Sequence, residues 1–137
     1  TTMSFSAVKL TLVILYMVFS SHLFANGESM SNTNKVFEIL TWKSKSGVSD
    51  EEMVKAVDGM VEDLRNLNGF LNQTLYKEKD GTWIDVYYWQ TEKDAHDSNG
   101  AMADKESFKK LMSIIEPDTV TLKVVSPKQS SGEILFK

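Results

Sequence analysis

Two carboxylates stand in strands that are otherwise apolar and aromatic. Glu38 lies within residues 35–42, and Asp85 lies within residues 82–89. Desolvation in such surroundings raises the pKa of a carboxyl group toward neutrality, where the group can act as a general base. If the two carboxylates share one cavity, their mutual repulsion also keeps one of them protonated near neutral pH. Glu38 and Asp85 are therefore the candidate catalytic residues.

Aromatic and amide side chains in the same strands are candidates for binding an aromatic substrate. Indole rings offer flat walls, and amide or phenol groups can form a hydrogen bond with a substrate oxygen. The candidate walls are Trp42, Trp83 and Trp89, and the candidate hydrogen-bonding residues are Asn72, Tyr76 and Tyr87. A more ordinary reading stays open, because carboxylates often pair with lysines and buried tryptophans often belong to a core or an interface.

The composition describes one globular domain without thiol chemistry. The chain has 137 residues, of which 25% are charged and 42% are hydrophobic, and these are ordinary values. It has no cysteine and only two histidines, His22 and His96, so we expect neither a disulfide, nor a lipid-anchored lipoprotein, nor a metal site. The net charge of −4 and the lack of a basic patch argue against binding to nucleic acid.

The first 25 residues have the pattern of a secretory signal peptide. Lys9 precedes the apolar run 10–19, which is short for a membrane span, and Ala25 offers a cleavage point. Leu23 occupies a position where a small residue is commoner, so an uncleaved anchor is the alternative. We therefore expect an exported protein, periplasmic or secreted, that is free of the membrane after cleavage. The expected division is a signal peptide (1–25), a flexible lead-in (26–34), a domain (35–127) and a C-terminal tail (128–137).

Residue patterns predict four strands and two helical regions. Ser49 and Glu52 form a capping box at the start of a helix whose apolar stripe continues to Leu67. Thr91 caps a second helical region, which is expected to be interrupted near Asn99-Gly100 and to end before Pro117. Asp80-Gly81 is a strong hairpin signal between two of the strands. The predicted strands cover residues 35–42, 70–79, 82–89 and 118–126.

This β-α-β-β-α-β order predicts an α+β, ferredoxin-like fold, in which an antiparallel sheet carries its helices on one face. We expect the more aliphatic side of each strand to face the helices, namely Phe37 and Ile39, Leu71 and Leu75, and Ile84 and Val86. The opposite side then carries Glu38, Trp42, Asn72, Tyr76, Trp83, Asp85, Tyr87 and Trp89. That side is too apolar to be left in water, which predicts that a second copy covers it in a homodimer.

The chain resembles the antibiotic biosynthesis monooxygenase-like family over about residues 35–126. The resemblance rests on Glu38 and Trp42, the turn Asn68-Gly69-Phe70, the Asp80-Gly81 hairpin, Tyr87-Tyr88-Trp89 followed by Thr91 and Asp94-Ala95, and Ser107-Phe108. It implies a dimeric α/β barrel with a cavity between sheet and helices. It also implies that no cofactor is required, since characterised members include cofactor-independent monooxygenases of polycyclic phenols. Other members are quinol oxygenases and haem-degrading enzymes.

The resemblance is weaker for the haem-degrading members. They use an asparagine on the first strand and a histidine in the middle of the helical region that follows the strand tryptophan. Here the first strand carries Glu38, and His96 comes only seven residues after Trp89. Haem binding through His96 is therefore the weakest of three hypotheses.

Two functions from different classes remain. The first is an exported monooxygenase-like enzyme acting on an aromatic, phenolic or quinol substrate, which serves as its own reductant while the protein supplies a base and an apolar pocket. The alternative is a non-catalytic module of the same fold that binds a small apolar molecule or serves as a dimeric interaction module. Glu38 distinguishes them: an unpaired Glu38 in a pocket favours the enzyme, and a salt-bridged Glu38 or a filled cavity favours the module.

Overall fold

The computed structural model describes residues 35–134. The predicted signal peptide and lead-in lie outside this range, as do residues 135–137 at the end of the tail. In the part of the chain that is described, no helix combines the length and the apolar character needed to cross a membrane.

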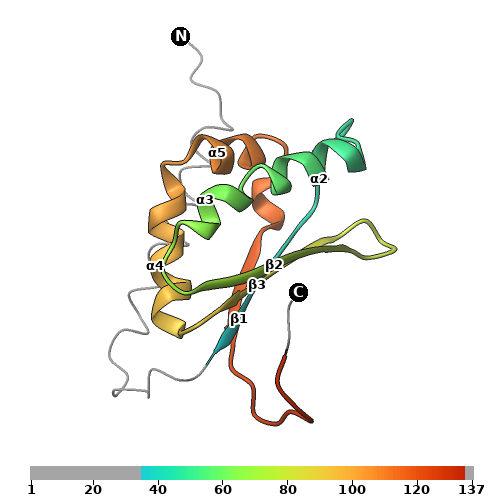
Figure 1. The fold of residues 1–137 in the computed structure, drawn as a ribbon. Helices are drawn as coiled ribbons and strands as arrows, with labels where there is room; N and C mark the ends of the chain where they lie inside the picture. The colour runs from blue at the N-terminus through green and yellow to red at the C-terminus, as the bar shows by residue number, and fades with distance from the viewer. Residues whose placement is uncertain (1–34, 135–137) are drawn as a thin grey trace.

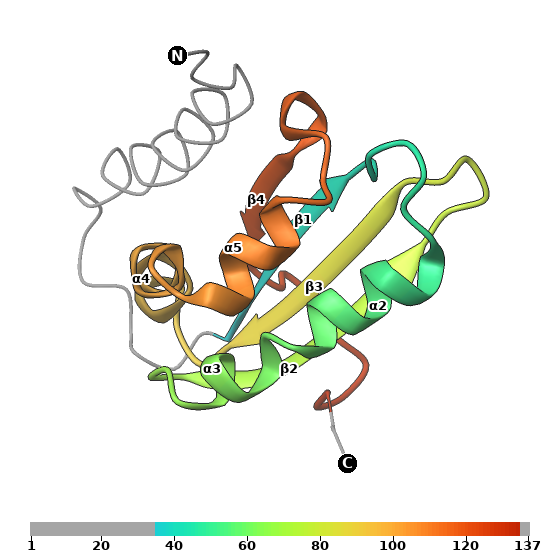
Figure 2. The same ribbon diagram turned by 90° about the horizontal axis from the view of Figure 1, so that it is seen from above.

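A four-stranded antiparallel sheet forms one layer, and the helices form a second layer on one of its faces (Figures 1 and 2). The strands run in the spatial order β2-β3-β1-β4. They are β1 (Val36–Trp42), β2 (Phe70–Lys77), β3 (Trp83–Trp89) and β4 (Thr121–Val125). The helices are α2 (Asp50–Asp58), α3 (Val61–Arg65), α4 (Glu92–Ala103) and α5 (Glu106–Met112), with a 3₁₀ turn η1 (Pro117–Thr119) before β4. The predicted ferredoxin-like order is confirmed.

The structure confirms two local predictions, the capping box at the start of α2 and the turn between β2 and β3. The Ser49 amide donates to Glu52 Oε2 at 2.7 Å, and the Glu52 amide donates to Ser49 Oγ at 3.2 Å, which is the capping box. Gly81 has φ +90° in the β2–β3 turn, a conformation that glycine adopts without strain. Such features can be predicted from the sequence because the interacting groups are only a few residues apart.

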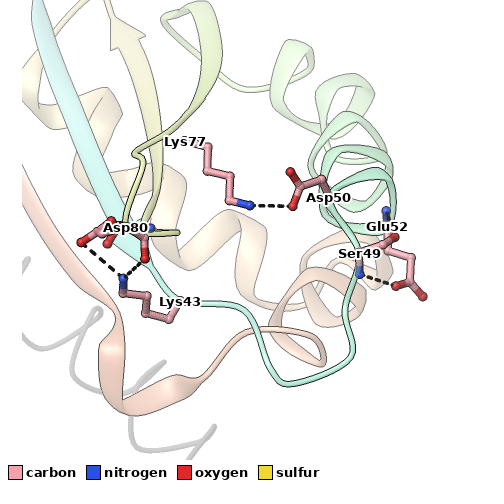
Figure 3. A network of polar contacts seen from close by, with 7 residues as sticks. Lys43, Ser49, Asp50, Glu52, Lys77 and Asp80 are labelled. Atoms are coloured by element: carbon pink, nitrogen blue, oxygen red, sulfur yellow. Dashed lines mark hydrogen bonds and ion pairs between the residues drawn. The ribbon is translucent and has the colours of Figure 1, made fainter.

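Polar contacts join the turn end of the β2–β3 hairpin to its surroundings (Figure 3). Lys77 Nζ lies 2.7 Å from Asp50 Oδ1, which links the end of β2 to the start of α2. Lys43 Nζ lies 3.4 Å from Asp80 Oδ2, which links the loop after β1 to the turn. All four side chains are at least one-third exposed, so we expect these pairs to contribute little to stability.

The helices differ from the sequence prediction in two places. The helix expected to reach Leu67 without a break is divided at Gly59 and Met60, where the Met60 amide donates to Val57 O. Conversely, α4 passes through Asn99-Gly100 without the expected interruption. A Cβ atom at Gly100 would meet nothing within 4 Å, so this glycine lowers helix propensity without disturbing the packing of α4.

In the two central strands, β1 and β3, the side that faces the helices is the opposite of the predicted one. Val36, Glu38, Leu40 and Trp42 of β1 are all buried, whereas Phe37 and Ile39 are only partly buried. The same holds for β3, where Trp83, Asp85, Tyr87 and Trp89 are buried beneath the helices. The aromatic and acidic side therefore forms the core with the helices, and the aliphatic side forms the open face. Both sides are apolar, so alternation alone could not decide which one the helices cover.

In β2 the predicted sides are confirmed, with Leu75 toward the helices and Asn72 and Tyr76 on the opposite face, but this separates Asn72 and Tyr76 from the acidic side of β1 and β3. A register shift between Phe70 and Asn72 leaves Asn72 opposite Tyr88, while Gln73 lies opposite Tyr87 and Leu75 opposite Asp85. Gln73 and Leu75 therefore share the core side with the acidic residues, and Asn72 and Tyr76 lie on the open face. A bulge of this kind inserts one residue on one strand, which a period-2 pattern cannot register.

Candidate functional site

A cavity lies between the sheet and the helices. Its volume is about 30 Å³, within about 450 Å³ of empty space that includes open solvent. Its lining is mainly apolar and comes from β1, β3, α3, α4 and α5 and the residue before α3. The lining residues are Glu38, Leu40, Trp42, Met60, Leu64, Tyr87, Trp89, Ser98, Asn99, Met102, Phe108, Leu111 and Met112. Three of them are methionines, whose flexible side chains can adjust to the shape of a ligand.

Glu38 is the acidic group of the cavity. It is 3% exposed, and among residues 35–134 no cation forms an ion pair with it. Its carboxylate accepts a hydrogen bond from Asn99 Nδ2 at 3.2 Å. Burial raises the pKa of Glu38 to about 8; the Asn99 amide and the nearby Trp89 indole moderate this rise, and Asp85 adds to it. Glu38 is therefore mainly protonated at pH 7 and is half ionised at about pH 8.

Asp85 lies behind Tyr87 and does not line the cavity. It is fully buried, and it accepts hydrogen bonds from Gln73 Nε2 and from the Tyr87 hydroxyl, each at 2.5 Å. Burial raises the pKa of Asp85 to about 6, against the opposing effect of these two donors. Burial, and after it the Asp85 carboxylate, raises the pKa of Tyr87 well above its usual value. Asp85 is therefore better suited to anchoring Tyr87 than to contacting a substrate.

The indole N–H groups of Trp42 and Trp89 are buried without a hydrogen-bond partner within the described range. Both rings line the cavity. The Trp89 N–H lies close enough to Glu38 to lower the pKa of that carboxyl, although the geometry falls short of a hydrogen bond. Buried polar groups are nearly always paired in folded proteins, so two unpaired donors at one cavity are noteworthy.

The structure brings together four of the eight predicted site residues. Glu38, Trp42, Tyr87 and Trp89 line the cavity. Asp85 lies directly behind it, and Trp83 packs in the adjoining core, where Lys77 Nζ lies 5.0 Å from its ring centre. Asn72 and Tyr76 lie on the other side of the sheet, where Tyr76 is 55% exposed.

Sequence reasoning missed the contributions of the helices to this site. Asn99 and Ser98 on α4, and Gln73 on β2, are polar residues that reach the cavity or its acidic network. The sequence gives Asn99 no role at the site, because the pair Asn99-Gly100 predicts an interruption of the helix. The signal available was its spacing from the buried Ala95 and Met102, which places it near the inward side of a continuous α4.

His96 lies on α4 and forms an ion-pair contact with Glu92, with 3.4 Å between Nε2 and Oε1. It does not line the cavity. Within residues 35–134, no three His, Asp or Glu side chains are grouped so that they could hold a metal ion.

Comparisons by sequence and by structure give different results. No protein-family model matches the chain, and no curated protein matches it by sequence. Among solved structures, the fold is similar to that of SnoaB, a cofactor-independent oxygenase from Streptomyces nogalater. The TM-score is 0.57 at 15% identity, and the match covers 74% of this chain and 100% of SnoaB.

Two further structures have the same fold. The ActVA-Orf6 monooxygenase of Streptomyces coelicolor, solved with the ligand nanaomycin D, matches with a TM-score of 0.52 and 18% identity, over 81% of this chain and 100% of its own. Rv0793 from Mycobacterium tuberculosis matches with a TM-score of 0.54 and 14% identity, over 72% and 99%. Identities this low establish the fold alone. The chain thus has the fold of these oxygenases, which is the fold that the sequence resemblance implied.

Proposed function

We propose that this protein oxidises a phenolic or quinol small molecule with molecular oxygen and without a cofactor. The observation that carries the proposal is Glu38, a buried carboxyl group without a cationic partner in the described range that lines an apolar cavity. A structural carboxylate would normally be paired when buried, because an isolated buried charge is costly. The likeness in fold to an oxygenase that needs no cofactor supports the same reading.

In this proposal Glu38 moves the protons and the substrate supplies the electrons. The Glu38 carboxylate removes a proton from an activated C–H or O–H group of the bound substrate, which leaves an electron-rich carbanion or phenolate. That anion reduces oxygen, and its carbon forms a bond with oxygen to give a peroxide, which takes the proton back from Glu38. Loss of the hydrogen that remains on this carbon, with cleavage of the O–O bond and departure of hydroxide, yields a carbonyl group and water.

Other groups at the cavity have supporting roles. Asn99 holds the Glu38 carboxyl and stabilises its ionised form. Asp85 holds the Tyr87 hydroxyl, so that the Tyr87 ring keeps its place as a wall of the cavity. The non-catalytic binding module remains the alternative, and it predicts that Glu38 can be replaced without loss of function.

Oxygen uptake by residues 35–137 against a panel of hydroquinones and anthrone-like phenols tests the proposal. Because the base must be ionised, we expect uptake to rise about tenfold per pH unit below pH 8 and to level off above it. Glu38→Gln keeps the side-chain shape but removes the base, so it is expected to lower uptake by about 100-fold or more.

The matched control is Glu52→Gln, which changes an exposed carboxylate of the capping box and leaves the cavity intact. It should retain both the rate and its pH profile. Uptake at the level of a protein-free blank across the panel would refute the enzyme and favour the binding module.

A further inference from the structure

The cavity between the sheet and the helices meets solvent at the seam between α4 and α5. The side chains that line it are buried, with two exceptions, Asn99 on α4 and Phe108 on α5, which are only partly buried. Because the empty space of the cavity continues into solvent, its opening lies where these two residues reach the surface. The opening is therefore bounded by α4 on one side and by α5 on the other.

The two sides of this opening are held in different ways. Asn99 donates hydrogen bonds from its Nδ2 to Glu38 Oε2 at 3.2 Å and to Ala95 O at 3.4 Å. Phe108 has no polar group, and its ring is held by packing against the core. A ring without a directional contact can turn aside at the cost of its packing alone. Phe108 is therefore the side of the opening that can move.

A hydrogen bond across the helix layer fixes the backbone that carries Phe108. The hydroxyl of Ser107, the preceding residue, donates to Asp63 Oδ2 on α3 at 2.6 Å. The helices that it joins have five (α3) and seven (α5) residues, and neither has a side-chain hydrogen bond at its N-cap. Helices this short depend on tertiary contacts for their position. The Ser107–Asp63 hydrogen bond therefore holds α5 against α3 at the rim of the cavity.

We propose that Phe108 is the gate of the cavity, and that the Ser107–Asp63 hydrogen bond is the latch that keeps this gate closed. With the latch formed, the Phe108 ring covers the opening and excludes water and solutes from Glu38. When the hydrogen bond breaks, α5 is released from α3 and the ring moves away from Asn99, so that a molecule can enter. The size of the ring then determines which molecules reach Glu38. This inference concerns access alone, so it goes beyond the proposed function and applies to an enzyme and to a binding module alike.

Water entry can be measured at Trp89, whose buried indole N–H lies beside Glu38 and has no hydrogen-bond partner in the described range. Exclusion of water is thus what protects this N–H from exchange with deuterium, and its exchange rate by NMR reports the opening of the cavity. We expect Ser107→Ala to raise that rate about tenfold, because the closed state loses a hydrogen bond to a charged group. Phe108→Ala should raise it at least as much. The backbone amides of β3, which report global unfolding, should be affected much less.

Three further variants separate the latch from a general loss of stability. Asp63→Asn keeps an acceptor oxygen for the Ser107 hydroxyl, so it should exchange near the wild-type rate, whereas Asp63→Ala should behave as Ser107→Ala does. The matched control is Ser113→Ala, which removes a hydroxyl at the end of α5 whose hydrogen bond, to Lys110 O at 2.6 Å, does not reach α3. It should leave the exchange of Trp89 unchanged, and a rise equal to that of Ser107→Ala would refute the latch.

Acrylamide, which is larger than water, tests the role of the ring itself. Its quenching of tryptophan fluorescence should increase in the order wild type, Phe108→Leu, Phe108→Ala, and the leucine variant covers the case in which the alanine variant does not fold. Equal quenching in the wild type and Phe108→Leu, or a rise in Trp89 exchange matched by the β3 amides, would overturn the gate. Neither measurement uses oxygen uptake, so the gate and the proposed oxygenase can fail separately.

Discussion

At the scale of single residues, the unusual feature is a pair of buried carboxyl groups with different surroundings. Asp85 is held by two donors, Gln73 and Tyr87, whereas Glu38 accepts one hydrogen bond from Asn99 and faces the cavity. The pKa of Asp85 rises to about 6 and that of Glu38 to about 8, because the better-satisfied carboxyl loses less of its charge stabilisation on burial. Asp85, whose oxygens are both held by hydrogen bonds, suits a structural role. Glu38, which faces the cavity, suits the role of a general base.

This difference predicts how stability changes with pH. Below pH 4.5 Glu38 is protonated in both the folded and the unfolded state, so it has no effect. Between pH 4.5 and 8 the unfolded chain releases this proton and the folded chain keeps it, so the free energy of unfolding falls as pH rises. The fall is about 1.4 kcal/mol per pH unit at most, and it ends above pH 8.

Urea unfolding at pH 5, 6.5 and 8 measures this slope. In Glu38→Gln the slope between pH 6.5 and 8 should disappear, so that the variant is more stable than the wild type at pH 8. Asp85 contributes a similar fall only between pH 3.8 and 6, which leaves the higher window to Glu38. Parallel pH curves for wild type and variant would show that Glu38 is not the buried acid described here.

At the scale of elements, the turn before β2 and the start of α4 are built against each other. Gly69 has φ +75°, and its carbonyl accepts a hydrogen bond from the Gln90 amide at 2.8 Å. A Cβ atom at position 69 would lie 2.1 Å from Asp94 Oδ2. Asp94 in turn is held by the Thr91 hydroxyl at 2.8 Å. Two segments that carried the family resemblance are therefore one structural joint, which orients α4 and places Asn99 over Glu38.

Gly69→Ala is expected to destabilise the fold by about 2 kcal/mol or more, because it combines a left-handed backbone with a steric clash. Thermal or urea unfolding measures the effect. In the double variant with Asp94→Ala the clash is gone and only the strain of the left-handed backbone remains. The double variant should therefore lose less stability than the two single variants lose in sum. Strictly additive effects would mean that the two residues do not meet. Gly100→Ala, at an open position in the same helix system, is the control and should be neutral or stabilising.

At the scale of the whole molecule, none of the helices within residues 35–134 covers the second face of the sheet. Phe37 stacks on Tyr88 there, with 4.5 Å between ring centres, and Tyr76 and Val125 are 55% and 40% exposed. The helices α2 to α5 lie on the opposite side of the sheet (Figures 1 and 2). We propose that a second copy of the chain covers this face. The sequence argument for a homodimer thus applies to the aliphatic side of the strands instead of the aromatic side.

Val86 tests this arrangement, because it lies in β3 between Ile39 and Thr74 of the neighbouring strands. Val86→Lys places a charge in the centre of the face, so it is expected to convert a dimer into a monomer with unchanged circular dichroism. Light scattering after size-exclusion chromatography measures the mass. Val54→Lys, at a residue 50% exposed on α2, should leave the dimer intact. A monomeric wild type at micromolar concentrations would exclude the proposed dimer.

The sequence by itself determined the features that depend on near neighbours. The capping box at Ser49, the turn at Gly81 and the order of strands and helices follow from residues that are a few positions apart. The alternation in β1 and β3 also identified which side chains lie on the same side of a strand, including Glu38 and Trp42. These features are local, so backbone geometry and side-chain period suffice to predict them.

Only the tertiary structure decided which side of the sheet is inside and what meets Glu38 there. Both sides are apolar, so the choice depends on the total packing of the helices against one of them. The bulge after Phe70 moved Gln73 to the core side, and Asn99 reaches Glu38 across 61 positions of the chain. Contacts between residues so far apart leave no periodic trace in the sequence. The cavity, its polar end and its unpaired indole donors therefore arise only when the helix layer closes on the sheet.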